Sequence, residues 1–425
     1  MIIKKAKIRG RDGVFDIKIE DDTITEVAPH IPVRDDEVID VDGRLLMPTY
    51  IDMHFHLDSV LTIGDPRFNQ SGTLLEGIEI WSEYKKKLSI EDIVNRCKKA
   101  LMLMVSYGTT RIRTHADVTE KNLTTLKGLL EVKRLFKDIV DIQITAFPQD
   151  GILTEPENVE LLEKAVETGA DNVGMIPHLE YTREDGVKSI EIAFDIAKKY
   201  DRDIDGHVDE TDDEQSRFLE VVAAKTIKEG YMGRVTAGHT TAMHSYNDAY
   251  ADKLYRILKK AEITIVPNPL INIHLQGRYD KYPKRRGLTR IKELLVNGVN
   301  VALGHDCIMD PWYPLGRGDM MQVLFMAVHV AQMMGYNELI KSFDLITVNG
   351  AKALRIESIY GIDKGKKADL VVLDAFNEIE ALAYLKRPLY VIKNGRIVSE
   401  RTVEEVKVFD PTYRKSIMLD ERILK

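Results

Sequence analysis

The pattern of apolar and polar residues at the two ends of the chain differs from the pattern in its middle. Near both ends they alternate residue by residue, and Asp-Asp, Asp-Gly and Asn394-Gly395 punctuate the runs. This alternation predicts short antiparallel strands joined by tight turns. The alternating segments are 1–10, 14–28, 36–48, 366–376 and 388–403. Because the two ends share one character, we predict a small β-sandwich domain built from residues 1–48 together with 355–425.

Between the ends, short apolar runs alternate with longer amphipathic stretches such as 90–108, 158–170 and 189–201. Alternating strands and helices predict a parallel sheet. The strand-like runs are 50–56, 109–115, 141–147, 172–178, 203–210, 233–239, 263–268 and 298–306. This number of strands suits a (β/α)8 TIM barrel, which we predict over residues 49–354. The main alternative is a doubly wound open sheet, but its glycine-rich phosphate turn after the first strand is missing.

Residues able to do chemistry fall at the ends of these predicted strands. They are His54, His56, His115, Gln149, His178, His207 with Glu210, His239, Asn268 and Asp306. In a barrel these ends meet at one face, where active sites form. Taken singly, each has a plainer explanation: two polar residues at a strand edge, a hydrogen-bonded structural histidine, or an aspartate that caps the next helix. Their coincidence at one rim favours a site.

The strand-end residues predict a metal centre of mixed nitrogen and oxygen ligands. Such a set suits Zn2+ or Fe2+ and leaves a position for water, whose pKa a bound ion lowers from about 15.7 to about 7. Asp306 could serve as both ligand and base, and Glu210 could carry a proton. His239 could orient the hydroxide or polarise the attacked atom. The predicted ligands are His54, His56, His207 and Asp306.

Composition narrows the classes of partner. The chain of 425 residues carries a formal net charge of -8 and a pI near 5.9. This balance argues against nucleic acid or an anionic membrane as the main partner. Its two cysteines, Cys97 and Cys307, have no short spacing, so we expect no disulfide framework and a reducing cytoplasm. We expect neither a signal peptide nor a membrane span.

Several motifs resemble those of known enzymes. "IDMHFH", "DGHVDE", "TAGHTTAMHSY" and "GHD", in this order, resemble the amidohydrolase superfamily. The fourth predicted strand has no lysine that could bridge two ions, so the resemblance implies one divalent metal ion. A closer resemblance is to the cytosine deaminase family, and it covers nearly the whole chain. It is carried by "NQSGTLLEGIEIW", "AFPQDGIL", "HVDETDDEQSRF", "NPLINIHLQGRYDKYPKRRGLTR" and "GHDCIMDPWYPLG".

This resemblance implies hydrolytic deamination of a nucleobase by attack of metal-bound hydroxide at C4. His54, His56, His207 and Asp306 would bind iron or zinc. Glu210 would protonate ring nitrogen N3 and then the leaving amine, and His239 would position the hydroxide. Gln149 would read the base, while Trp312, Phe147 and Leu74 would form apolar walls, although aromatic residues near a strand end usually belong to the core. The family also implies a homo-oligomer such as a hexamer.

One position departs from the family pattern. Well-known cytosine deaminases read His-Asp-Asp where this chain has His305-Asp306-Cys307. A small, weakly polar Cys307 leaves more room near the amine and C5 of the ring. We therefore expect 5-substituted cytosines such as 5-methylcytosine to react at least as well as cytosine, unless Cys307 is a neutral packing change. Isoguanine deamination, ring-opening amide hydrolysis and a non-catalytic scaffold are the alternatives; such scaffolds generally lack the metal ligands.

Overall fold

The computed structural model describes residues 1–403, 407–409 and 416–418, and the chain divides into two compact units. One unit contains Tyr50–Met104 and Thr109–Ile356. The other contains Met1–Thr49, Val105–Gly108 and the described part of Glu357–Lys425. The predicted domains, 49–354 and 1–48 with 355–425, stay a prediction, and part of the second lies outside the described residues.

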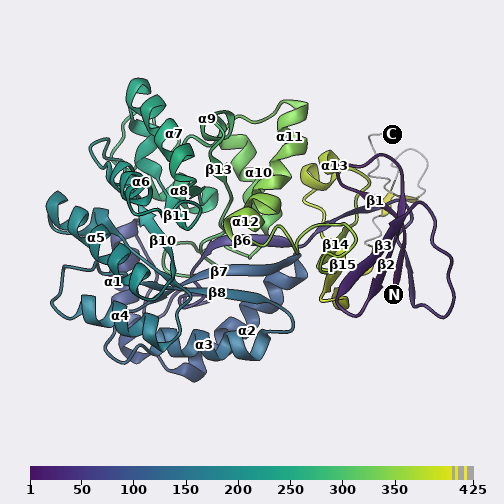
Figure 1. The fold of residues 1–425 in the computed structure, drawn as a ribbon, viewed down its shortest axis with the longest axis horizontal. Helices are drawn as coiled ribbons and strands as arrows, with labels where there is room; N and C mark the ends of the chain where they lie inside the picture. Colours follow the sequence, from purple (N-terminus) through teal and green to yellow (C-terminus); the bar gives the residue numbers. More distant parts are fainter. Residues whose placement is uncertain (404–406, 410–415, 419–425) are drawn as a thin grey trace. The chain divides into compact units, whose positions relative to one another are not determined.

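The first unit is built on eight parallel strands that lie side by side in chain order (Figure 1). They are β6 (Tyr50–Phe55), β7 (Thr109–Asp117), β8 (Asp141–Phe147), β9 (Asn172–Val173), β10 (Asp203–Val208), β11 (Val235–His239), β12 (Thr264–Val266) and β13 (Asn300–Val301). The sheet curls until a parallel bridge joins Phe55 to Asp306. This closure confirms the predicted barrel and excludes the open sheet.

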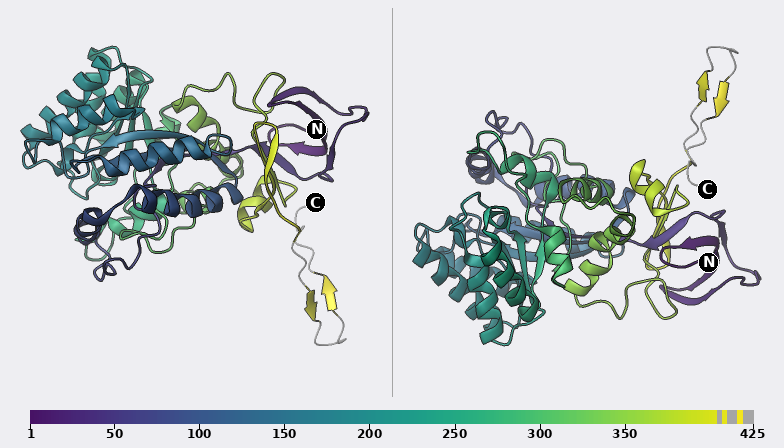
Figure 2. Two further views of the ribbon diagram at one scale, coloured as in Figure 1. Left: turned by 90° about the horizontal axis from the view of Figure 1, so that it is seen from below. Right: turned by 90° about the horizontal axis from the view of Figure 1, so that it is seen from above.

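Helices follow the strands along the chain and pack outside them, as two further views show (Figure 2). All of β7 is buried, although most of its residues are polar and it carries the buried side chains of Arg111, Arg113 and His115. None of the helices in the described part of the chain has both the length and the apolar character that a membrane span requires. The α-helices that accompany the barrel strands are α1 (Leu74–Tyr84), α2 (Ile90–Ser106), α3 (Thr124–Phe136), α4 (Asn158–Thr168), α5 (Arg183–Lys199), α6 (Phe218–Lys228), α7 (Asp248–Ala261), α8 (Pro269–Leu275), α9 (Ile291–Val296), α10 (Met320–Val330), α11 (Tyr336–Ser342) and α12 (Val348–Ala353).

Some elements differ in length from the prediction. The predicted strand 172–178 is regular only at Asn172–Val173. Pro177 has no N–H to donate, and the chain turns there into a short 3-10 helix, η2 (Pro177–Leu179). Helix α5 begins earlier than the predicted 189–201, because the Thr182 hydroxyl caps it by accepting the N–H of Asp185 at 3.0 Å.

The second unit confirms a terminal β domain made from both ends of the chain. Strand β1 pairs with β2 and β4 through its first residues and with β5 through its last, so it belongs to both halves of the sheet. The helix α13 (Glu378–Ala383) lies between β14 and β15 in the chain. The strands are β1 (Ile2–Ile8), β2 (Phe15–Glu20), β3 (Thr23–Ala28), β4 (Val38–Asp40), β5 (Leu45–Pro48), β14 (Leu370–Leu373), β15 (Pro388–Lys393) and β16 (Arg396–Glu400). A separate pair joins β17 (Lys407–Phe409) to β18 (Ser416–Met418).

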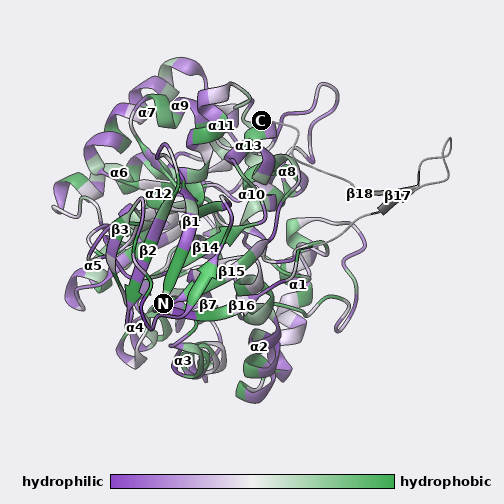
Figure 3. Ribbon diagram, turned by 90° about the vertical axis from the view of Figure 1, so that its right-hand side faces the viewer, coloured by the Kyte–Doolittle hydropathy of each residue, from purple (hydrophilic) through white to green (hydrophobic). Residues whose placement is uncertain are grey.

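Side chains from both ends share the core of this unit. Isoleucines of β1, β2 and β3 pack with Leu370, Val372 and Ile392. Strand β14 is buried throughout and hydrophobic along its length (Figure 3). The predicted turn between β15 and β16 is confirmed, since Asn394 and Gly395 have φ of 49° and 73°. Positive φ at both positions is what a type I′ hairpin turn requires.

Candidate metal centre and active site

The seam that closes the barrel carries the first group of site residues. His54 and His56 lie at the end of β6, and Asp306 follows β13. The backbone N–H of Asp306 donates to the carbonyl of His54 at 2.9 Å, and that of His56 donates to the carbonyl of Asp306 at 2.8 Å. This interlock directs the Asp306 carboxylate at both imidazoles. Its Oδ1 lies 3.8 Å from His54 Nε2 and 3.7 Å from His56 Nε2.

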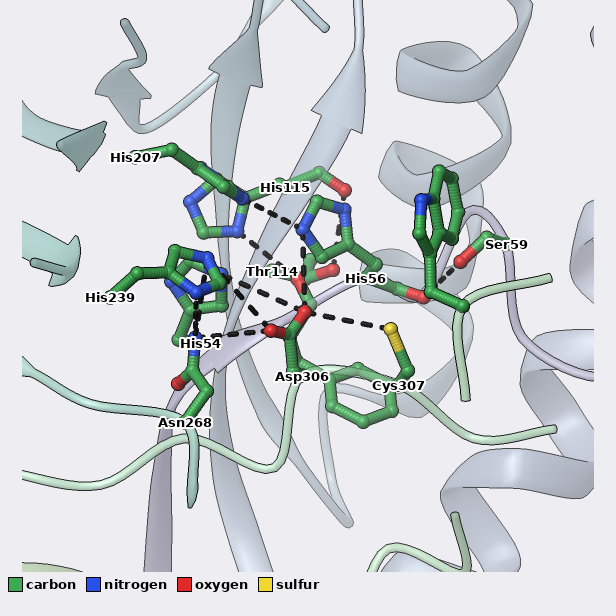
Figure 4. Close-up of polar contacts among 12 residues, drawn as sticks. His54, His56, Ser59, Thr114, His115, His207, His239, Asn268, Asp306 and Cys307 are labelled. Carbon is green, nitrogen blue, oxygen red and sulfur yellow. Dashed lines mark hydrogen bonds and ion pairs between the residues drawn. The ribbon is translucent and has the colours of Figure 1, made fainter. Parts of the chain in front are cut away.

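His207, on β10, completes the group from the opposite part of the barrel. Its Nε2 lies 3.1 Å from Nε2 of His56 (Figure 4). Two glycines make room for the His54 ring between the strands. A Cβ at Gly238 would lie 2.7 Å from His54 Nδ1, and one at Gly304 would lie 2.5 Å from His54 Cβ. Larger residues at these positions would displace the imidazole.

The electrostatics of this group suit a divalent cation. Burial lowers the pKa of His54, His56 and His207 well below the usual value, so the rings are neutral and keep a lone pair for a ligand. Neither nitrogen of His54 has a hydrogen-bond partner among the described residues. Burial also raises the pKa of Asp306 well above its ordinary range, a cost that a bound cation would relieve.

The donor set therefore fits Zn2+ or Fe2+. Zinc binds imidazole nitrogen at about 2.0–2.1 Å, so two nitrogens 3.1 Å apart can share one ion. His54, His56, His207 and His115 form one candidate group of metal ligands. In His115, however, Nδ1 lies 3.2 Å from the Phe55 carbonyl oxygen and Nε2 lies 3.2 Å from Asp205 Oδ2. Nδ1 of His115 thus has an acceptor of its own, whereas neither nitrogen of His54 has a partner among the described residues, so the predicted set with Asp306 remains the candidate ligand group.

His239 and Glu210 lie beside the metal centre. The Asn272 side-chain amide donates to His239 Nδ1 at 2.9 Å, which places the ring proton on Nε2, 3.8 Å from Asp306 Oδ2. Glu210 Oε1 lies 3.3 Å from His239 Nδ1. Burial raises the pKa of Glu210 to about 8, so its carboxyl group holds a proton at neutral pH.

A pocket opens beside these groups. The predicted substrate residues Gln149, Cys307, Trp312 and Leu74 all line it. Apolar side chains dominate its wall and a few polar groups converge in it, which is typical of sites for small molecules. The remaining lining residues are His56, Ile78, Ile176, His178, Leu179, His207, Glu210, His239, Ile271, Leu275 and Asp306.

Phe147 was predicted to form a wall of the pocket, but it packs behind it. It is fully buried and stacks on the His207 ring, with centroids 4.1 Å apart and planes at 21°. It does not line the pocket and instead supports a candidate metal ligand from behind. Strand alternation could not show this, because it does not tell which ring a buried aromatic residue meets.

Trp312 lies against α1 because Gly77 has no side chain. A Cβ at Gly77 would lie 2.4 Å from Trp312 Cδ1. Sequence reasoning missed this contact, and it also missed the apolar residues of α1 and α8 that line the pocket, Ile78, Ile271 and Leu275. The amphipathic pattern of a helix cannot by itself distinguish a pocket wall from the core.

Cys307 is buried beside the metal centre. Its Sγ lies 3.5 Å from Asp306 Oδ1, and burial next to Asp310 and Asp306 raises the pKa of the thiol well above its usual value. The thiol therefore stays protonated and can donate to Asp306.

Asp306 does not cap a helix, which was the plainer explanation of this residue. The next helix is α10 (Met320–Val330), and Asp319 caps it.

The chain is similar to known proteins over most of its length. Residues 37–399 match the model of the Amidohydrolase family. Two crystal structures of 5-methylcytosine deaminase from Klebsiella pneumoniae, liganded with 5-fluorocytosine or phosphonocytosine, have 43% sequence identity to this chain. The first covers 96% of this chain and 99% of its own, with a TM-score of 0.93. N-isopropylammelide isopropyl amidohydrolase of Pseudomonas sp. (strain ADP) is 32% identical over 94% of this chain and 96% of its own.

Proposed function

Because this chain belongs to the amidohydrolase family, we propose that it deaminates cytosine or a 5-substituted cytosine. The reaction consumes water and releases the corresponding uracil and ammonia. The observation that carries this substrate class is the 43% identity, across nearly the full chain, to a protein named 5-methylcytosine deaminase. The pocket supports it, since Gln149, Glu210 and Cys307 line one cavity beside the candidate metal ligands.

The metal would be a zinc or iron ion, held by His54, His56, His207 and Asp306. A bound divalent ion lowers the pKa of water from about 15.7 to about 7 and so supplies hydroxide at neutral pH. His239 would orient the attacking oxygen through Nε2–H. Glu210, protonated because it is buried, would give its proton to ring nitrogen N3. Its carboxylate would then take the remaining proton of the attacking oxygen and pass it to the amine, which leaves as ammonia.

Other pocket residues would hold the flat ring. The amide of Gln149 offers a donor and an acceptor side by side, which matches an edge of the base. Trp312 and Leu74 would cover its faces. Cys307 contributes a small, neutral side chain near the amine and C5, so a methyl group on C5 finds space that an aspartate would deny. A methyl group in such a pocket is worth about 1 kcal/mol, or several-fold in specificity.

The second candidate function is removal of an amine from another aminated heterocycle, such as isoguanine. It is favoured by the relative named N-isopropylammelide isopropyl amidohydrolase, which is 32% identical over nearly the whole chain. Both candidates use the same metal centre, so the pocket wall decides between them. Ring-opening amide hydrolysis would use that centre too, but it would destroy the ultraviolet band of the ring.

The test is ammonia release by metal-loaded protein, with kcat/KM for cytosine, 5-methylcytosine and isoguanine side by side. We expect 5-methylcytosine to equal or exceed cytosine, with the ultraviolet band of the ring preserved. A clear lead for cytosine would make Cys307 a neutral packing change. Release of ammonia from isoguanine alone would favour the second candidate. No ammonia from any of the three would overturn the proposed function.

A further inference from the structure

His178 lines the pocket, but the proposed mechanism gives it no role. It lies in η2, which begins four residues after the end of β9. Both ring nitrogens are buried, and neither has a hydrogen-bond partner among the described residues. A buried donor or acceptor without a partner destabilises the fold, and native proteins rarely keep one without a reason. A polar atom of the substrate is the partner that the pocket could supply.

The segment that carries His178 is held firmly in place. The Glu180 carboxylate accepts the N–H groups of Ile152 at 2.7 Å and Leu153 at 3.1 Å. It thereby ties η2 to the loop that follows Gln149. On the other side, helix α5 packs so closely that a Cβ at Gly186 would lie 2.6 Å from the Pro177 carbonyl oxygen. The backbone that carries His178 is thus held relative to the loop that follows Gln149.

The order of the strands suggests which substrate atom His178 meets. Gln149, His178 and Glu210 follow the neighbouring strands β8, β9 and β10, so they occur in this order around the rim. In a cytosine ring, N1, the C2 carbonyl and N3 follow one another in the same order. We propose that His178 donates a hydrogen bond to the C2 oxygen of the base. This inference rests on the proposed function, in which Glu210 meets N3.

The chemistry of the side chain suits this role. Burial lowers the pKa of His178 to about 3, so the ring is neutral and carries one N–H donor. A carbonyl oxygen accepts such a donor without any change of protonation. His178 would then select aminated rings that have an oxygen next to N3. Heterocycles that lack this oxygen would leave the donor unpaired and would bind more weakly.

The test compares cytosine with 4-aminopyrimidine, which lacks the C2 oxygen, in the wild type and in His178→Phe. Losing the oxygen also changes N1, so the informative quantity is the difference between the two proteins. We expect His178→Phe to lower kcat/KM for cytosine roughly ten- to a hundredfold while 4-aminopyrimidine changes little. If 4-aminopyrimidine is not turned over, its inhibition constant replaces kcat/KM. The matched control is His329→Phe, at an exposed histidine on α10.

An equal loss for both compounds would overturn the proposal and leave His178 a structural residue. The proposal would also be overturned if His178→Phe kept the wild-type preference for cytosine over 4-aminopyrimidine, with wild-type metal content and thermal stability. His178→Met, which is apolar and flexible, serves if the phenylalanine variant does not fold. Failure of the wild type to release ammonia from cytosine would instead count against the proposed function, so the two failures are distinguishable.

Discussion

The Nε2 atoms of His56 and His207 face each other 3.1 Å apart, although the two histidines lie 151 positions apart in the chain. Both rings are buried, and burial lowers the pKa of each well below its ordinary value. Two neutral imidazoles that point nitrogen at nitrogen must share either one proton or one cation. With Asp306 Oδ1 only 3.7 Å from His56 Nε2, the arrangement favours a cation.

Removing His207 should therefore remove the metal. We expect His207→Asn to lower both the metal content and the rate of ammonia release, the rate by at least about a hundredfold, since even indirect support of a metal ligand is worth about 10–100-fold. Metal analysis after dialysis and the ammonia assay measure the two effects. His329→Asn, at an exposed histidine, is the control. A variant that keeps one ion and the wild-type rate would show that His207 is not a ligand.

The buried carboxyl group of Glu210 should make the stability of metal-free protein depend on pH. Its pKa is about 8 in the folded chain, against an ordinary value of 4.5. Between these values only the folded state holds the proton, so the free energy of unfolding falls as pH rises, by about 1.4 kcal/mol per pH unit from this group. Above pH 8 its contribution is constant. Glu210→Gln cannot titrate and should gain stability relative to the wild type across this window.

Urea unfolding at several pH values from 5 to 9, in the presence of a chelator, measures the difference between the two proteins. Other buried carboxyl groups titrate in the same range, with the pKa of Asp52 at about 8 and that of Asp58 at about 7. Asp52 and Asp58 are present in both proteins and cancel in the difference. Asp306, whose pKa the charge of Glu210 helps to raise, adds to the difference in the same direction. Parallel pH profiles would contradict a raised pKa at Glu210.

Replacing Cys307 should change the preference between cytosine and 5-methylcytosine. Cys307→Asp adds a carboxylate beside Asp306 and Asp310, whose effects already raise the pKa of the Cys307 thiol. A charged, hydrated group disfavours a methyl group nearby, so we expect the ratio of kcat/KM to shift several-fold toward cytosine. Cys307→Ser, small and neutral, should keep the wild-type ratio. If Cys307→Asp left the ratio of kcat/KM for cytosine and 5-methylcytosine unchanged, this position would not select for the methyl group.

Arg278 joins two segments that bear pocket residues. Its guanidinium donates to the carbonyl oxygens of Ser71 at 3.2 Å, Gly72 at 2.5 Å and His274 at 2.7 Å. The first two precede α1, which begins at Leu74, and the third lies in α8. Because each hydrogen bond contributes about 1 kcal/mol, we expect Arg278→Ala to loosen the pocket wall and raise KM by several-fold to tenfold, with a smaller effect on kcat.

Steady-state kinetics on the better substrate measures this effect. The control is Arg286→Ala, because Arg286 belongs to the same loop but donates to the Val330 carbonyl oxygen at 2.7 Å, at the end of α10. Equal values of KM in the two variants would show that the contacts of Arg278 do not shape the pocket.

Most strands of the barrel could be predicted from the spacing of short apolar runs along the chain. All eight strands form within or next to the predicted runs. A purely apolar pattern is not required, since Arg111 and Arg113 are buried within β7 and Asp205 within β10. The ends of the runs identified the residues of the rim. The same spacing overestimated β9 and β13, each of which is regular over only two residues.

The sequence by itself determined which residues are available at the rim. Alternation along a strand placed His54 and His56 on one side, and the position of Asp306 after the last strand placed it near them. Only the tertiary structure decided which of these side chains meet. Closure of the barrel brings Asp306 between the two histidines, and packing turns Phe147 onto His207 rather than into the pocket. Such contacts join residues far apart in the chain, and they depend on curvature and side-chain packing that no local pattern contains.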